Sequence, residues 1–232
     1  MLRAIRVELR KMFSQRGTYA GFLVLAIMIG LIVWGMWRHS GCHFKLDRMN
    51  NEDFLVSGNA TTAPFVMQFL LPATMEVLMP LLIAAIAGGL VAAEVRSGTI
   101  RTLLLRPITR LQLLTGKMVA VWVYTLTLCV FVMLFGGAMA YSIFGPGDLM
   151  SILAHGLVIF SHQEALGRLA LAYGFAFLGR LVIALIALMF SCLFDNGLTA
   201  AALTVASLIV FNALQQIPYF ESWSPYFLTK LL

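Results

Sequence analysis

Long apolar runs alternate with short polar segments along this chain. An α-helix needs about 20 apolar residues to cross the hydrocarbon core of a bilayer. Five runs approach or reach that length, at residues 18–37, 75–93, 117–141, 169–194 and 198–214. A spanning segment must satisfy its backbone polar groups internally, as a helix or as part of a closed barrel. Because these runs are continuous and do not alternate in polarity, they exclude a barrel and predict an all-α integral membrane protein.

The segments between these runs predict shorter elements. Residues 1–16 form an amphipathic pattern, which is typical of a helix lying in the membrane interface. We interpret the run that follows as an uncleaved first span. The apolar segment 64–72 has a proline at each end and is too short to span. Asp148 is expected to cap a short apolar helix. Ser161 and Glu164 have the spacing of a capping box, so the helix of the fourth span is expected to begin there.

Composition supports a membrane protein and charge sets its orientation. The chain of 232 residues is 61% hydrophobic and 11% charged, which fits one transmembrane domain over residues 1–232. Its net charge of +6 is better explained by membrane topology than by binding to nucleic acid. With the N-terminus in the cytoplasm, the cytoplasmic segments carry ten cations and the outer segments four. This is the distribution that orients membrane proteins.

Five of the sixteen Lys and Arg residues lie in one segment, residues 94–117, between the second and third spans. Gly98 is expected to end the second span, and Thr99 to cap a short helix that ends before Pro107. Thr109 and Gln112 have the spacing of a second capping box. The short helix would carry an apolar face in the cytoplasm, which predicts docking into a groove of a partner. The alternative is a basic hairpin that only fixes topology.

This segment resembles the coupling-helix region of ATP-binding-cassette type-2 permeases, the membrane subunits of bacterial exporters. The residues that carry the resemblance are Glu94, Gly98, Thr99, Ile100, Leu103, Leu104, Pro107, Arg110 and Lys117. The resemblance implies a multi-pass protein of the bacterial inner membrane, a second permease copy or a homologous permease, and a separate cytoplasmic ATPase that binds ATP and Mg. It also implies six spans, of which five are visible, with the sixth expected after Leu232 or missing from an atypical member.

The function expected from these patterns is that of an exporter permease without catalytic residues of its own. The chain has no G-x4-GK[ST] phosphate loop, so ATP hydrolysis is assigned to the partner, and no cofactor is expected here. The group His39, Cys42 and His43 is weak evidence for a metal site, and none is assigned. Two alternatives remain open: a channel or ion-coupled secondary carrier, and a non-transporting anchor that relays ATPase motion.

The charged residues Glu76 and Arg180 lie inside apolar runs. Measured along their helices from the cytoplasmic side, they lie at similar depths, so we hypothesise an ion pair in the outer half of the bundle. Pairing would offset the cost of placing each charge in the membrane. The alternative is that Glu76 touches water at the outer surface, while Arg180 pairs with a lipid phosphate or a helix carbonyl.

Overall fold

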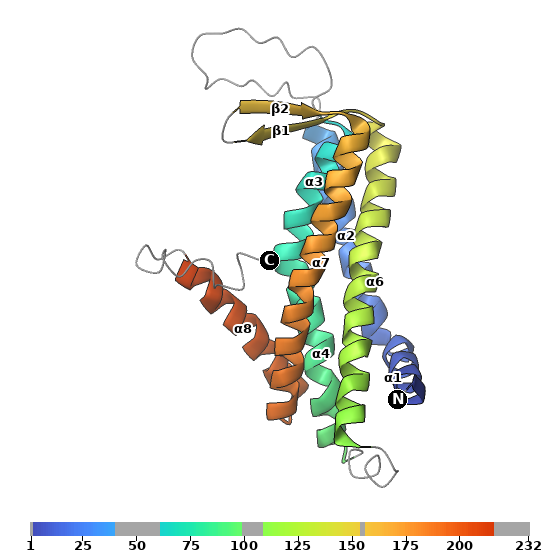
Figure 1. Ribbon diagram of the computed structural model, residues 1–232, viewed down its shortest axis with the longest axis vertical. Helices are drawn as coiled ribbons and strands as arrows, with labels where there is room; N and C mark the ends of the chain where they lie inside the picture. Colours follow the sequence, from blue (N-terminus) through green and yellow to red (C-terminus); the bar gives the residue numbers. More distant parts are fainter. Residues whose placement is uncertain (1, 40–60, 99–108, 154–155, 216–232) are drawn as a thin grey trace.

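The computed structural model describes residues 2–39, 61–98, 109–153 and 156–215 of the chain. Long helices run side by side, with a β-hairpin across one end and the N-terminal helix beside the other (Figure 1). We call these the hairpin end and the α1 end. The elements in chain order are α1 (Leu2–Ser14), α2 (Arg16–His39), α3 (Ala63–Ala73), η1 (Thr74–Leu78), α4 (Met79–Arg96), α6 (Arg110–Phe144), β1 (Leu149–Leu153), β2 (Gly156–Phe160), α7 (His162–Leu193) and α8 (Gly197–Gln215).

Among the described residues, four helical segments are long and apolar enough to cross a membrane: Gly17–His39, Ala63–Arg96, Leu111–Phe144 and His162–Leu193. They confirm a multi-pass helical membrane protein. The fifth predicted run is also helical, as α8, but its apolar part, Gly197–Ala213, is shorter than these four. In Figure 1, α8 leaves the α1 end at an angle to the other long helices.

The apolar segment 64–72, predicted to be too short to span, is part of a longer membrane helix. It forms α3 and continues through η1 into α4, giving 34 residues from Ala63 to Arg96. The prediction was wrong because Pro72 was interpreted as a break. Pro72 lies inside α3, and proline is tolerated in membrane helices because local π or 3₁₀ turns and neighbouring helices satisfy the freed backbone groups.

The segment after Asp148 is a β-hairpin, not the short apolar helix predicted from the sequence. Strands β1 and β2 pair antiparallel, with Leu149 opposite Phe160 and Leu153 opposite Gly156. Short apolar runs do not distinguish a strand from a helix by periodicity. The β-branched residues Ile152, Val158 and Ile159 favour the extended conformation.

Helix boundaries follow the capping signals closely. Thr109 and Gln112 form the predicted capping box at the start of α6, with both reciprocal hydrogen bonds present. Gly98 follows the end of α4 with φ of +70°, a conformation that glycine adopts at no steric cost. Helix α7 begins directly after Ser161 as predicted, but the Ser161 side chain makes no capping hydrogen bond, so the expected capping box is not formed there.

The core of the bundle is apolar and lies between α2, α4, α6 and α7. Leu25 and Ile29 of α2, Ile83 of α4 and Leu128 of α6 are fully buried. The N-terminal segment predicted to be a helix forms α1, with Met12 fully buried against the bundle and Val7 exposed, and its position in the membrane interface stays a prediction. The packing brings the start of α6 and the end of α4 together beside α1.

Candidate functional site

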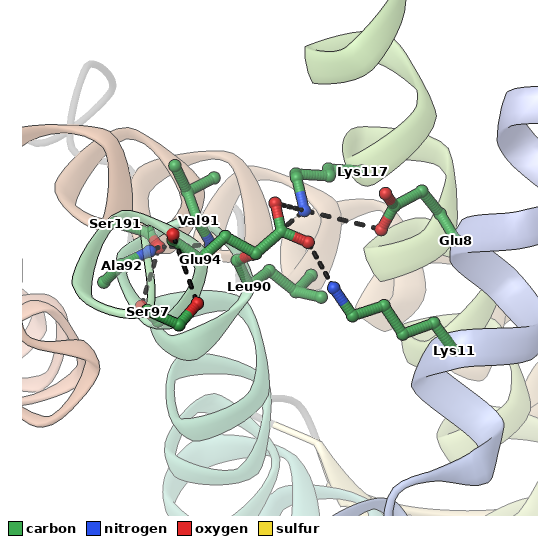
Figure 2. Close-up of polar contacts among 10 residues, drawn as sticks. Glu8, Lys11, Leu90, Val91, Ala92, Glu94, Ser97, Lys117 and Ser191 are labelled. Carbon is green, nitrogen blue, oxygen red and sulfur yellow. Dashed lines mark hydrogen bonds and ion pairs between the residues drawn. The ribbon is translucent and has the colours of Figure 1, made fainter. Parts of the chain in front are cut away.

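Four charged side chains from three helices meet at the α1 end of the bundle. They are Glu8 and Lys11 from α1, Glu94 from the last turn of α4, and Lys117 from the third turn of α6 (Figure 2). We call this group the ion-pair cluster. Its two carboxylates and two ammonium groups balance in charge, so it can be buried as a neutral unit.

Lys117 is the centre of the ion-pair cluster. Its Nζ lies 2.8 Å from Glu94 Oε2 and 3.4 Å from Glu8 Oε2. It also donates a hydrogen bond of 3.0 Å to the carbonyl oxygen of Leu90 in α4. Only 1% of Lys117 is exposed. Three acceptors from two other helices therefore replace the water that the ammonium group loses on burial, and the contacts tie α6 to both α1 and α4.

Glu94 connects the two lysines. One carboxylate oxygen, Oε1, pairs with Lys11 and the other with Lys117. Glu94 is 4% exposed, whereas the side chain of Lys11 is 46% exposed. The Lys11 pair is therefore screened by solvent and weaker than the buried pair with Lys117. Together, the two pairs hold α1 and α6 against the end of α4, two residues before that helix ends.

A second polar contact joins α7 to α4, about one turn before Glu94 along α4. Ser191 of α7 donates a hydrogen bond of 2.6 Å from Oγ to the carbonyl oxygen of Gly88. The same Oγ accepts hydrogen bonds from the N–H groups of Val91 (3.1 Å) and Ala92 (3.2 Å). A hydroxyl that enters the backbone ladder of a helix in this way is a recognised cause of local bending. It joins α7 to the part of α4 that leads to the ion-pair cluster (Figure 2).

The structure brings together two of the residues selected from the sequence, Glu94 and Lys117. Gly98 lies at the turn that follows α4, and Arg110 is the first residue of α6. Thr99, Ile100, Leu103, Leu104 and Pro107 lie outside the described residues, so the predicted short helix stays a prediction.

Sequence reasoning missed three members of this site: Glu8, Lys11 and Ser191. A signal was present for Glu8, which is the only acidic residue among the first 17. An isolated acid in a basic amphipathic helix indicates a buried partner for a cation. Ser191 carried no comparable signal, because a serine in an apolar run commonly bonds its own helix.

The hypothesised ion pair between Glu76 and Arg180 is not formed as a direct contact. Arg180 is 1% exposed, whereas Glu76 lies on the surface of the bundle. The ion pairs of the described residues do not include either of them.

Together, the long apolar helices and the buried cluster of charges at one end define a multi-pass helical membrane protein. Residues 22–232 match the family described as "Protein of unknown function (DUF2705)", and the chain belongs to this family. It is also similar to the "Uncharacterized protein YhcI" of Bacillus subtilis (strain 168), with 29% identity over 140 residues. That match covers 59% of this chain and 45% of the relative, so the chain spans less than half of that protein's length.

Proposed function

We propose that this chain is the membrane-spanning permease subunit of an ATP-driven exporter in the bacterial inner membrane, paired with a second permease and driven by a separate cytoplasmic ATPase. One observation carries the proposal. Glu94 and Lys117, the first and last residues of the segment that resembles a coupling-helix region, meet in a buried ion-pair cluster with α1.

The cluster gives that segment the mechanical connection that a coupling element needs. Residues 99–108 are joined to α4 on one side and to α6 on the other, and Lys117 ties both helices and α1 together close to those junctions. A force applied to this segment would therefore reach three helices at once. Ser191 extends the connection from α4 to α7.

The proposed direction of coupling rests on the cation count, which favours a cytoplasmic position for the α1 end. ATP-driven closure of the ATPase would press on residues 99–108. Tilting of α4 and α6 would then open or close a pathway shared with the second permease. This chain would supply the wall of the pathway and the lever, and the ATPase would supply ATP binding and hydrolysis with Mg.

The docking prediction is tested by replacing both Leu103 and Leu104 with aspartate in an affinity-tagged chain. We expect the wild-type chain to retain an ATP-binding-cassette ATPase after mild detergent extraction, identified by mass spectrometry, and the double variant to lose most of it. Two buried leucines contribute ~1.5–3 kcal/mol each, so the loss should exceed tenfold. Thermal unfolding of the membrane bundle should be unchanged.

Leu198→Asp is the matched control for this experiment. Leu198 is 77% exposed in the first turn of α8, at the same end of the bundle but outside the segment 94–117. The control variant should retain the ATPase. Equal retention by the double variant would exclude the docking role of Leu103 and Leu104, and a wild-type chain that retains no ATPase would contradict the proposed function itself.

The buried charge of Arg180 favours a second candidate function, an ion-coupled carrier or channel. Ionisable residues inside a membrane bundle commonly mark ion or substrate pathways, and Arg180 is 1% exposed within α7. Reconstitution in liposomes separates the two candidates. Substrate movement that needs ATP and the ATPase supports the exporter, whereas movement driven by an ion gradient in this chain alone supports the carrier.

A further inference from the structure

The membrane helix that contains Glu76 is not regular at that residue. Residues Thr74–Leu78 form the π-helical turn η1, in which the Met79 N–H bonds to the Thr74 carbonyl, five residues back. Pro80 explains the wide turn, because in an α-helix the N–H of residue 80 would bond to the Glu76 carbonyl, and proline has none. Single π turns inside α-helices frequently occur at functional sites.

The wide turn is what places Glu76 on the surface. If the α-helical register of α4 continued toward the hairpin end without interruption, Glu76 would share a face with Pro80, Ile83 and Ala87, at i+4, i+7 and i+11. All three of those residues are buried. Glu76 is instead exposed, because the extra residue in the π turn rotates it away from that face.

Arg180 lies level with Glu76 on the neighbouring helix α7. Toward the hairpin end, Tyr173 of α7 donates a hydrogen bond to the Met67 carbonyl, at a sequence separation of 106. Toward the α1 end, Ser191 contacts Gly88 at a separation of 103. The two helices run in parallel between these contacts, and the separation between Glu76 and Arg180 (180 − 76 = 104) lies between the two values.

Arg180 lacks a counter-ion in the part of the chain that the structure describes. It is the largest fully buried side chain, and its Nε has no hydrogen-bond partner. The described acidic residues other than Glu76 are either in the ion-pair cluster or at the ends of the bundle: Glu8, Glu94, Asp148, Glu164 and Asp195. A buried arginine without an acidic partner carries a high cost, and Glu76 is the acid placed to relieve it.

We propose that the η1 turn is a conformational switch that moves Glu76 between the surface and an ion pair with Arg180 inside the bundle. The wide turn would move one turn along the helix to Pro72, which also supplies no N–H. Residues 74–78 would then join the α register of α4 and rotate by about 100°, one residue's angular step. Glu76 would enter the buried face beside α7. This proposal does not depend on the proposed transport function.

The test measures chemical modification of Glu76 in the full-length chain in membranes. A hydrophobic and a water-soluble carbodiimide are used in parallel, so that an exposed Glu76 reacts whether it faces lipid or water, and peptide mass spectrometry gives the modified fraction. Pro80→Ala restores the N–H that favours the α register at Glu76. We expect it to raise the ratio of buried to exposed Glu76 about fivefold, the change that one net hydrogen bond supplies, and so to lower the modified fraction.

Two comparisons make this result specific. Pro72→Ala disfavours the alternative position of the wide turn, so modification of Glu76 should stay at or above the wild-type value. In the Arg180→Gln background the ion pair that holds Glu76 inside is gone, so the buried state is too rare for the same fivefold shift to lower the modified fraction measurably. An unchanged fraction in Pro80→Ala, an equal decrease in the Arg180→Gln background, or no modification of wild-type Glu76 by either reagent would overturn the switch.

A second readout does not require the Arg180→Gln variant to fold. With histidine introduced by Glu76→His and Arg180→His together, Zn²⁺ can bridge the two imidazoles when they meet. Zn²⁺ should raise the thermal unfolding temperature of this double variant more with Pro80→Ala than with Pro72→Ala, and should have no effect on either single histidine variant. Equal Zn²⁺ effects in the two proline backgrounds would contradict the switch.

Discussion

Lys117→Met should destabilise the bundle by ~3–5 kcal/mol, because it removes one partner from a buried ion pair and leaves carboxylates without compensation. Glu94 and Glu8 are 4% and 5% exposed, so water cannot replace the lost ammonium group without opening the contact between α1, α4 and α6. Methionine is similar to lysine in length and flexibility, so the loss is of charge more than of volume. Thermal or denaturant unfolding of the purified protein measures it.

Lys11→Met is the matched control for Lys117→Met. Lys11 also pairs with Glu94, but its side chain is 46% exposed, and exposed ion pairs contribute about 0–1 kcal/mol. Adding Glu8→Gln and Glu94→Gln to Lys117→Met should recover much of the lost stability, since neutral amides cost less to bury than unpaired carboxylates. If Lys117→Met and Lys11→Met are equally mild, the ion-pair cluster does not hold the helices together.

Local signals in the sequence predicted local structure well. The Thr109 and Gln112 capping box depends only on residues within one helical turn, and it is present in the structure. Gly98 likewise follows the end of α4 with a positive φ, which glycine adopts at no steric cost. Four of the five apolar runs predicted as spans lie in helices of membrane length, since length and composition alone largely determine that outcome.

The errors arose where the same local signal allows two structures. The run from Leu149 to Phe160 is too short for periodicity to separate a strand from a helix, and only pairing of its two halves shows that it is a hairpin. Pro72 gave a similar ambiguity. Proline ends many helices in soluble proteins, but here Ala63–Arg96 remains one membrane helix that contains it.

The candidate site could be predicted only in part, because half of it comes from distant segments. Glu94 and Lys117 were selected from one continuous motif. Their partners Lys11 and Glu8 lie 83 and 109 residues away from Glu94 and Lys117, respectively. No periodicity in the sequence links residues that lie so far apart. The depth estimate put Glu76 and Arg180 at similar depths, but it could not include the π turn that rotates Glu76 outward.

The closest backbone approach among the described glycines is between α4 and α8. A Cβ atom added at Gly88 would lie 2.9 Å from the backbone nitrogen of Ala201 and 3.0 Å from the carbonyl oxygen of Gly197. A Cβ atom at the adjacent Gly89 would meet no atom within 4 Å. Small residues at such crossings let membrane helices pack closely without a large hydrophobic driving force.

Gly88→Leu should therefore separate α8 from α4 and destabilise the bundle by ~1–3 kcal/mol or more, because the backbone atoms of α8 cannot move aside as a flexible side chain would. Gly89→Leu is the control with the same added volume one residue away, and it should be neutral or gain up to ~1 kcal/mol from helix propensity. Thermal unfolding in detergent compares the two variants. Equal stability of the two leucine variants would show that the Gly88 contact does not position α8.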